Sequence, residues 1–414
     1  MTSRQISFFF AAIGLWLLAA PVTFGYNDGI MILNDQITGV LLVILGFIGA
    51  MISSKGQVPI FLGLGLWLSV APLVFWALEP IAFLNDTLVG MIILFFAFRY
   101  PGMQGRSEEP LGEAPPGWSF NPSGWGPRTC TIFLAMLCWF LSRYLSAYQL
   151  GYIQNVWDPF FGSETVQVLT SNVADFFPVS DAGLGAFAYS LEAFLGFQGN
   201  SQRWRTMPWL VVLFGFLVVP AGLVSIILIV LQPIVVGAWC GLCLVIASCM
   251  LVMIMLTISE VAATLQFLIA TKKSCGVFWM VFWKGARAIE GKNPIKDSWG
   301  ISAPWNLALT AAIGAWLMCS PAILQISGIV SYSVYTAGPI LIAVSIISFA
   351  EVARSFRYVN LILAVWLLVS PWILEGASLS FIVSNSGCAI LVIVLSLIKG
   401  EITQKFGSWS KFIN

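Results

Sequence analysis

The sequence has 414 residues, of which 59% are apolar and only 9% are charged, and its formal net charge is +1. So small a share of charged residues excludes an ordinary soluble domain, and the balanced net charge indicates no nucleic-acid partner. The chain contains no histidine. This excludes His-ligated haem, zinc or copper sites that need histidine, and a catalytic pair of a nucleophile with histidine.

Long apolar segments recur along the whole chain. Several uncharged runs of roughly 16–25 residues are each long enough to cross the ~30 Å hydrocarbon core of a bilayer as a helix. We therefore predict an all-α polytopic membrane protein with about twelve transmembrane helices. In this prediction a central four-helix bundle is flanked by two pairs of helical hairpins.

An internal repeat occupies both ends of the chain, at residues 1–100 and 304–414, the latter including a C-terminal tail. In four places a tryptophan precedes a proline by five positions: Trp16/Pro21, Trp67/Pro72, Trp316/Pro321 and Trp366/Pro371. Each copy continues through a short polar stretch to a second apolar run, which predicts a transmembrane hairpin. The proline falls late in the first helix, where neighbouring helices can cover the broken hydrogen bond.

These repeats resemble the SPW-repeat membrane module, and the last copy contains the letters SPW at 370–372. We find no titratable residue within their apolar runs and interpret them as a scaffold, a lipid contact or a partner surface. The polar "ND" stretches at 34–35 and 85–86 are expected in the loops between the hairpin helices.

The remaining segments are two linkers and a central module. Residues 101–127 are rich in Pro, Gly and Ser and predict a cytoplasmic linker, and the basic residues 271–303 predict a second one. Between them, residues 128–270 contain four apolar runs, at 129–152, 183–197, 207–232 and 236–270. We expect one helix from each run.

The charges predict the orientation of the chain. With the N-terminus inside, every Lys and Arg except Arg143 falls in an inner loop or tail. The outer loops then hold Asp28, Asp35, Glu79, Asp86, Asp158, Glu164, Asp175 and Glu375. The positive-inside rule therefore predicts a protein of the plasma (inner) membrane, with both termini cytoplasmic and residues 240–243 on the extracytoplasmic side.

Of the eight cysteines, only Cys240 and Cys243 form a close pair, in the stretch "GAWCGLCLV" at 237–245. A structural zinc site of four cysteines needs a second pair, and none exists, so we expect no metal. A helix that begins near Trp239 places both thiols on one face, where its N-terminus favours a thiolate. Gly237 and Gly241, four apart, permit close approach of a flat ligand or another helix. The spacing alone leaves open whether the pair is redox-active or two small core residues.

Three local motifs carry a further resemblance: "WCGLC" at 239–243, "LTS" at 169–171 and "PVSDAGLGAFAY" at 178–189. With these motifs, residues 128–270 resemble the vitamin K epoxide reductase family of four- or five-helix membrane enzymes. The resemblance implies a thiol oxidoreductase that passes electrons from extracytoplasmic protein thiols to a quinone, either menaquinone or ubiquinone. The thiols would come from a thioredoxin-like dithiol protein or a larger membrane complex.

The resemblance also implies roles for single residues. Cys240 would be the outward, exchanging thiol and Cys243 the quinone-facing one. Ser171 falls at the family's serine, and Asp181 falls where the family often has an asparagine that hydrogen-bonds a quinone carbonyl. The expected quinone site consists of Asp181, Ser171, Trp157, Trp239, Gly237 and Gly241.

Other roles compete at several of these positions. Ser180 or Asp181 is a good N-cap for the helix at 183–197. Trp157, with Phe160 and Phe161, lines a pocket or belongs to an interfacial aromatic belt.

One departure from the family is plain. Its members usually carry two more cysteines in the loop after the first helix, but residues 153–182 contain none. Trp157 and Thr165 stand roughly where these cysteines are expected. Two interpretations follow: a partner exchanges directly with Cys240, or the module is a non-catalytic scaffold or accessory subunit. As a scaffold it would keep the fold and bind lipid, a quinone or a partner complex.

Overall fold

The structure is a computed structural model that describes residues 3–52, 55–100, 114–275, 278–286 and 298–413. Much of the two predicted linkers, with Arg106, Arg287, Lys292 and Lys296, lies outside the described residues. Within the described ranges the chain is helical, with two isolated β-bridges and no strand. The all-α fold predicted from the sequence is therefore confirmed.

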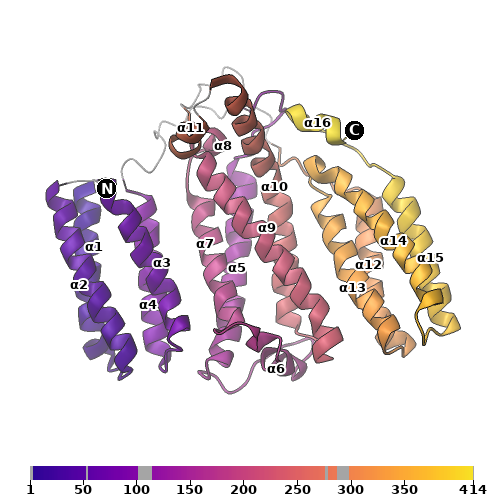
Figure 1. The fold of residues 1–414 in the computed structure, drawn as a ribbon, viewed down its shortest axis with the longest axis horizontal. Coiled ribbons are helices and arrows are strands. Elements are labelled where there is room, and N and C mark those ends of the chain that lie inside the picture. The colour runs from indigo at the N-terminus through magenta and orange to yellow at the C-terminus, as the bar shows by residue number, and fades with distance from the viewer. Residues whose placement is uncertain (1–2, 53–54, 101–113, 276–277, 287–297, 414) are drawn as a thin grey trace. The chain divides into compact units, whose positions relative to one another are not determined.

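The chain divides into two compact units. Unit 1 comprises Met1–Glu108, Met136–Trp157 and Leu169–Gly199, and unit 2 comprises Glu109–Ala135, Asp158–Val168 and Asn200–Asn414. The helices of unit 1 are α1 (Ser3–Phe24), α2 (Gly29–Ile52), α3 (Val58–Val74), α4 (Pro80–Phe98) and α7 (Asp181–Phe197), with the 3₁₀ turns η1 (Lys55–Gln57) and η2 (Ala174–Phe176). Helix α5 (Trp125–Gln149) contributes its later residues to unit 1 and its first residues to unit 2. Figure 1 labels the helices by these names.

Unit 2 holds the remaining elements. They are α6 (Glu164–Leu169), α8 (Arg203–Thr206), α9 (Pro208–Leu231), the π-helical turn η3 (Gln232–Val236), α10 (Gly241–Cys275), α11 (Phe278–Lys284), α12 (Trp305–Leu324), α13 (Ile329–Ile347), η4 (Glu351–Tyr358), α14 (Val359–Ile373), α15 (Leu379–Leu397), η5 (Gly407–Trp409) and α16 (Ser410–Ile413).

The described helices establish a multi-pass membrane protein. Ten of them are long and apolar enough to cross a bilayer, and α3 is a shorter apolar helix. Helices α3 and α7 have 17 residues each, which is the lower limit for a spanning helix. The expected number of about twelve spans requires both of them and stays a prediction.

Each hairpin of the repeats is a closely packed helix pair, and glycine permits the close approach. A Cβ atom on Gly14 of α1 would lie 2.6 Å from the carbonyl oxygen of Gly39 in α2. The same relation recurs between Gly314 of α12 and Gly338 of α13, where the corresponding distance is 2.8 Å. Because any side chain would collide with the facing backbone, these crossings require glycine.

The polar "ND" stretches do not lie in loops, and that expectation is wrong. Asp35 lies within α2 and Asp86 within α4, and both are fully buried. The reason is that the helices begin earlier than the charge pattern indicates, at Gly29 and at Pro80. The first hairpin pair therefore carries two carboxyl groups between its helices.

Unit 2 contains a buried ion pair between Arg203 of α8 and Glu260 of α10. Glu260 of α10 accepts hydrogen bonds of 2.6 Å from both Nε and Nη2 of Arg203, and one of 2.5 Å from the hydroxyl of Ser123. Ser123 in turn accepts from the backbone N–H of Trp204. The pair fixes α8 and the segment before α5 against α10, which is the helix that carries the cysteines.

Candidate functional site

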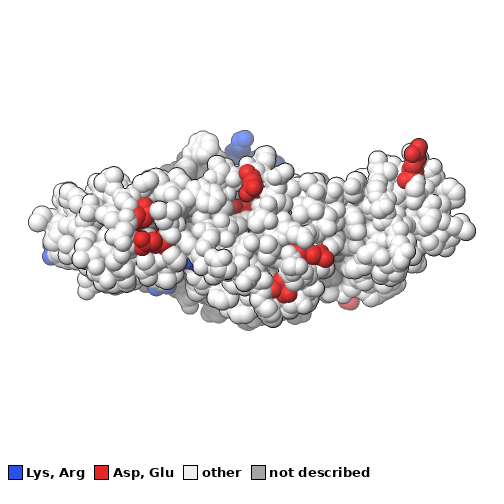
Figure 2. Space-filling model, turned by 90° about the horizontal axis from the view of Figure 1, so that it is seen from below, with Lys and Arg blue, Asp and Glu red and all other residues white. Residues whose placement is uncertain are grey.

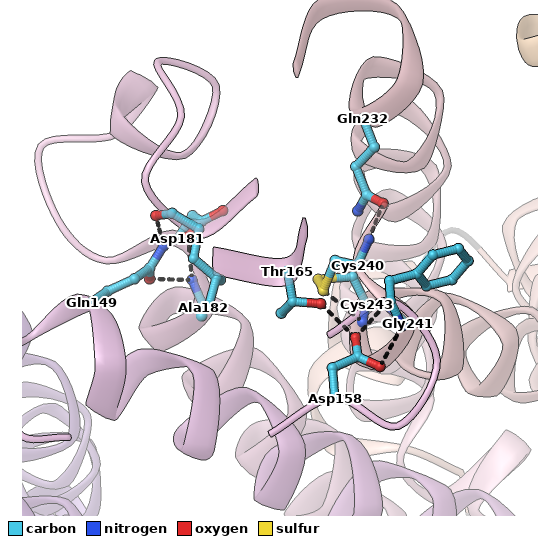
Figure 3. The surroundings of a disulfide bond; sticks show 11 residues. Gln149, Asp158, Thr165, Asp181, Ala182, Gln232, Cys240, Gly241 and Cys243 are labelled. Carbon is cyan, nitrogen blue, oxygen red and sulfur yellow. Dashed lines mark hydrogen bonds between the residues drawn. A yellow bond between two sulfur atoms is a disulfide. The ribbon is translucent and has the colours of Figure 1, made fainter. Parts of the chain in front are cut away.

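The cysteine pair lies at the start of the long helix α10. The chain leaves the π-helical turn η3 through Gly237, whose φ is +73°, a left-handed conformation that favours glycine. Cys240 and Cys243 then form a disulfide with their Cα atoms 5.2 Å apart (Figure 3). Cys240 is fully buried, whereas Cys243 is only partly buried.

Four backbone N–H groups at this helix start have acceptors. Trp239 N donates to Glu164 Oε2 at 3.1 Å, Cys240 N to Gln232 Oε1 at 3.0 Å, and Gly241 N to Asp158 Oδ2 at 2.7 Å. Cys243 N donates to the Sγ atom of Cys240 at 3.1 Å. The sequence suggested unpaired N–H groups that favour a thiolate. Instead, two carboxylates and one amide take three of them, and only the fourth points at sulfur.

Asp158 joins the loop before α6 to the cysteine helix. Its Oδ2 also accepts from the hydroxyl of Thr165 at 2.5 Å, and its Oδ1 accepts from Phe160 N at 2.8 Å (Figure 3). Burial alone would raise the pKa of this carboxyl group, but the hydrogen bonds from Thr165 and from three backbone N–H groups outweigh it. The pKa of Asp158 therefore lies below its usual range, and the group is ionised at neutral pH.

Gly241 is the point where the loop touches the helix. A Cβ atom there would lie 2.6 Å from Oδ1 and 2.9 Å from Oδ2 of Asp158, and 2.9 Å from the ring of Phe160. Gly241 was expected from its spacing to permit close approach. The structure shows that a segment of the same chain makes that approach. Gly237 has no neighbour within 4 Å of such an atom, so its role is the left-handed turn.

Trp239 belongs to unit 2 with the cysteines, whereas Asp181, Ser171 and Trp157 belong to unit 1. Ser180 is the N-cap of α7, because its hydroxyl accepts from Gly183 N at 2.9 Å. Oδ1 of Asp181 accepts from Gln149 Nε2 at 2.6 Å and from Ala182 N at 2.7 Å (Figure 3). Capping therefore rests with Ser180, and Asp181 is held by the amide of Gln149.

Ser171 and Trp157 complete the set. The hydroxyl of Ser171 accepts from Ala174 N at 3.4 Å, at the start of η2. The backbone N–H of Trp157 donates to the hydroxyl of Tyr144, and the Trp157 side chain is 72% exposed. Thr165, at the other expected cysteine position, is fully buried.

Sequence reasoning missed four polar residues around these sites: Gln149, Asp158, Glu164 and Gln232. Gln232 accepts from the backbone N–H of Cys240, eight residues away. Asp158 and Glu164 accept from backbone N–H groups that lie 83 and 75 residues away in the sequence. No local spacing signals such a pair. Gln149 was hidden at the end of an apolar run. Among the described residues no group of three or more Cys, Asp or Glu is arranged to hold a metal ion.

Comparison with known families assigns the parts of the chain. Residues 129–258 match the vitamin K epoxide reductase family, and residues 4–99 and 304–399 match the SPW repeat domain. Both resemblances noted in the sequence, and their flanked arrangement, are thereby confirmed. No curated protein and no solved structure matches the chain.

Proposed function

The central domain of this membrane protein belongs to the vitamin K epoxide reductase family, and from this premise we propose that the protein is a quinone-linked thiol–disulfide oxidoreductase of the plasma membrane. The observation that carries the proposal is the Cys240–Cys243 disulfide at the start of α10. A disulfide at a helix start, held by local polar groups, is suited to thiol exchange.

The exchange has two halves. A thiolate of an extracytoplasmic dithiol partner attacks Cys240, and Cys243 leaves as the thiolate. The second partner thiol then resolves the mixed disulfide, so that the partner is oxidised and both cysteines are reduced. A quinone, when bound, supplies the acceptor of two electrons and two protons, and the Cys240–Cys243 disulfide forms again. Cys243 N, at 3.1 Å from the Sγ of Cys240, supports negative charge on that sulfur during the exchange.

Access to Cys240 requires movement of the loop at 158–165. Cys240 is fully buried, and Asp158 and Phe160 pack on the adjacent Gly241. The bonds from Asp158 to Thr165 and to Gly241 N hold this closed form. We infer that a partner engages Cys240 only when these bonds open, and that Thr165 serves the closure in place of a loop cysteine.

Unit 1 offers groups that fit a quinone. A cleft of about 580 Å³ is lined by apolar side chains, including Trp76, Leu169 and Phe177, and by the polar groups of Gln149 and Ser180. Pockets of this size and mixed lining hold small ligands. We propose that Gln149, held by Asp181, presents the amide that the family takes from asparagine. Gln149 Nε2 donates two hydrogen bonds, one of 2.6 Å to Asp181 Oδ1 and a weaker one of 3.3 Å to the Leu169 carbonyl oxygen.

The charges support the orientation proposed here, with residues 240–243 outside and both termini inside. Asp28, Glu79, Asp158 and Glu164 lie in or beside the connections at one end of the helices of their own units. In Figure 2, Asp and Glu side chains stand out on the visible side of each unit taken by itself, and few Lys or Arg side chains are visible there. A face poor in basic residues is expected on the extracytoplasmic side.

A second function, a non-catalytic scaffold or accessory subunit, is favoured by one observation. The loop at 153–182 contains no cysteine, and Thr165 is bonded within the closed loop. A protein of this kind would keep the disulfide as a structural bond.

One experiment separates the two functions. The midpoint potential of the Cys240–Cys243 pair is measured by thiol trapping in glutathione buffers, with and without menaquinone or ubiquinone. For the enzyme we expect reversible cycling and quinone-driven oxidation, both lost in Cys243→Ser. Cys319→Ser is the matched control, because Cys319 is an exposed free cysteine. Thiols that stay inert to both reagents would refute the enzyme and support the scaffold.

A further inference from the structure

The N-terminal repeat domain contains a buried polar cluster inside unit 1. Asp35 of α2 and Asp86 of α4 lie close enough for their carboxyl groups to interact with each other, and both are fully buried. Asp86 accepts from Asn34 Nδ2 at 3.0 Å and from Asn85 Nδ2 at 3.2 Å. Oδ2 of Asp35 accepts from the hydroxyl of Tyr26. The donors of the cluster thus serve three of the four carboxyl oxygens.

The fourth oxygen, Oδ1 of Asp35, has no hydrogen-bond partner and is shielded from water. Among the residues that the structure describes, no Lys or Arg forms a salt bridge with Asp35 or Asp86 either. Arg143 of α5, which reaches α4 beside the cluster, donates instead to the hydroxyl of Thr87 at 2.7 Å and lies over the ring of Phe83. Asp28, at the hairpin turn, is occupied by the backbone N–H groups of Ile30 and Leu78.

These contacts are consistent with one protonation state of the Asp35–Asp86 pair. Two adjacent carboxylates that are buried without a cation do not both stay ionised, and such a pair shares one proton. Asp86 already accepts two amide N–H groups, so it is the better carboxylate. A proton on the unpartnered Oδ1 of Asp35 would give this oxygen a hydrogen bond, which it would donate to the Asp86 carboxylate.

The C-terminal repeat domain, in unit 2, shows that these carboxylates are not needed for the fold. In the N-terminal domain, Trp16 Nε1 donates to Asn85 and Trp67 Nε1 donates to Asn34, at 3.0 and 2.8 Å. In the C-terminal domain the corresponding bonds run from Trp316 to Ser384 and from Trp366 to Ser333, at 3.2 and 2.9 Å. The residue after each acceptor is aspartate in the first domain, but it is asparagine or valine, Asn385 or Val334, in the second.

We propose that Asp35 and Asp86 form a proton-binding site of the N-terminal repeat domain, in which Asp35 carries one exchangeable proton and donates it to the Asp86 carboxylate. Loss of the proton to water takes the pair from one negative charge to two. Tyr26, in the turn between α1 and α2, connects Asp35 to the end of the hairpin and marks the route of exchange. The site is separate from the cysteine pair and does not depend on its activity.

Infrared difference spectroscopy on the full-length protein at neutral pH tests the site, in water and in deuterium oxide. Wild type minus Asp35→Asn should show the C=O band of a protonated carboxyl group, shifted by deuterium. Asp86→Asn should keep this band at a changed frequency, because the acceptor becomes an amide. Asp28→Asn, the matched control, should leave the band unchanged. Glu192 of unit 1 is also fully buried, and neither of its carboxyl oxygens has a hydrogen-bond partner. The variant Glu192→Gln therefore identifies the band of Glu192, so that it is not mistaken for that of Asp35.

Three results would overturn the proposal. The first is the absence of a protonated-carboxyl difference between wild type and Asp35→Asn. The second is a band that deuterium does not shift, which would mean a trapped structural proton. The third is a band that appears only after sodium removal, which would mean a monovalent cation site. If Asp35→Asn fails to fold, isotope-labelled aspartate shows whether the band belongs to an aspartate, and its change of frequency in Asp86→Asn then assigns it to the pair.

Discussion

Asp158 is the residue on which the closed form of the cysteine loop depends. It accepts from Thr165, from Gly241 N and from two loop N–H groups, all of which favour the ionised carboxylate. A group whose pKa is lowered by folding contributes stability above its ordinary pKa, near 4. It loses that contribution as the pH falls through the lowered value.

We therefore predict that acid opens the loop. Reduction of Cys240–Cys243 by a phosphine, which works in acid, should be slow at neutral pH and should accelerate below about pH 4. In the Asp158→Asn variant, the disulfide should be reduced about tenfold faster at neutral pH, because the substitution weakens the charge-assisted hydrogen bonds that close the loop. The rate of disulfide reduction in this variant should vary little with pH. Disulfide reduction is followed by alkylation and mass spectrometry. An Asp158→Asn variant that keeps the wild-type pH profile would show that another group controls closure.

In the function proposed above, the carboxylates also bear on the direction of electron flow. Reduction places thiols, and at times a thiolate, beside Asp158 and Glu164. These two carboxylates accept from the backbone N–H groups of Gly241 and Trp239, the two neighbours of Cys240 in the sequence. Negative charge near a thiolate disfavours it. The surroundings thus favour the disulfide form, which fits a dithiol that passes its electrons on readily.

Among the elements, the start of α10 depends on two glycines for different reasons. Gly241→Ala places a methyl group against Asp158 and Phe160, so we predict a cost of about 1–3 kcal/mol and faster reduction of the disulfide. Gly237→Ala meets no neighbour but strains a φ of +73°, so we predict a cost of about 1 kcal/mol without faster reduction. Thermal unfolding and the reduction assay together test this. Equal reduction rates in the two variants would show that the loop contact does not protect the pair.

The apolar runs predicted the helices of the central domain closely. The run at 207–232 became α9, Pro208–Leu231, and the run at 183–197 became α7, Asp181–Phe197. The start of α10 was expected near Trp239, and it lies at Gly241 after a π-helical turn. Side-chain acceptors fix that start, and hydrophobic periodicity carries no information about them.

The buried aspartates show where the sequence misled. The charge pattern places an acidic residue in a loop, because an isolated carboxylate in a membrane is costly. Asp35 and Asp86 escape this rule because they meet each other and the amides of Asn34 and Asn85. Such compensation arises only when helices that are distant in the sequence pack together.

At the scale of the whole molecule, the family assignment, the repeats and the multi-pass character followed from the sequence. The cysteine pair followed as well, since its spacing is local. The partners of each site residue did not follow, because residues such as Gln232, Glu164 and Asp158 reach the pair from other elements.

The stability of unit 2 should depend strongly on its buried ion pair. Glu260→Gln leaves the buried guanidinium of Arg203 without its counter-charge, so we predict a loss of about 3–5 kcal/mol in the free energy of unfolding. Unfolding of the purified protein in detergent by denaturant measures it. Glu401→Gln is the control, because Glu401 is exposed. A Glu260→Gln loss no larger than that of the control would show that the pair is not stabilising.

Helix α10 is therefore anchored at two levels. Asp158 and Gln232 hold the residues at its start, and Arg203 holds Glu260, about 28 Å farther along the helix axis. Because helix α10 is held at both of these points, it is not free to slide along its axis or to rotate about it. We therefore expect the movement that accompanies the proposed thiol exchange to be confined to the loop at 158–165, while helix α10 stays in place.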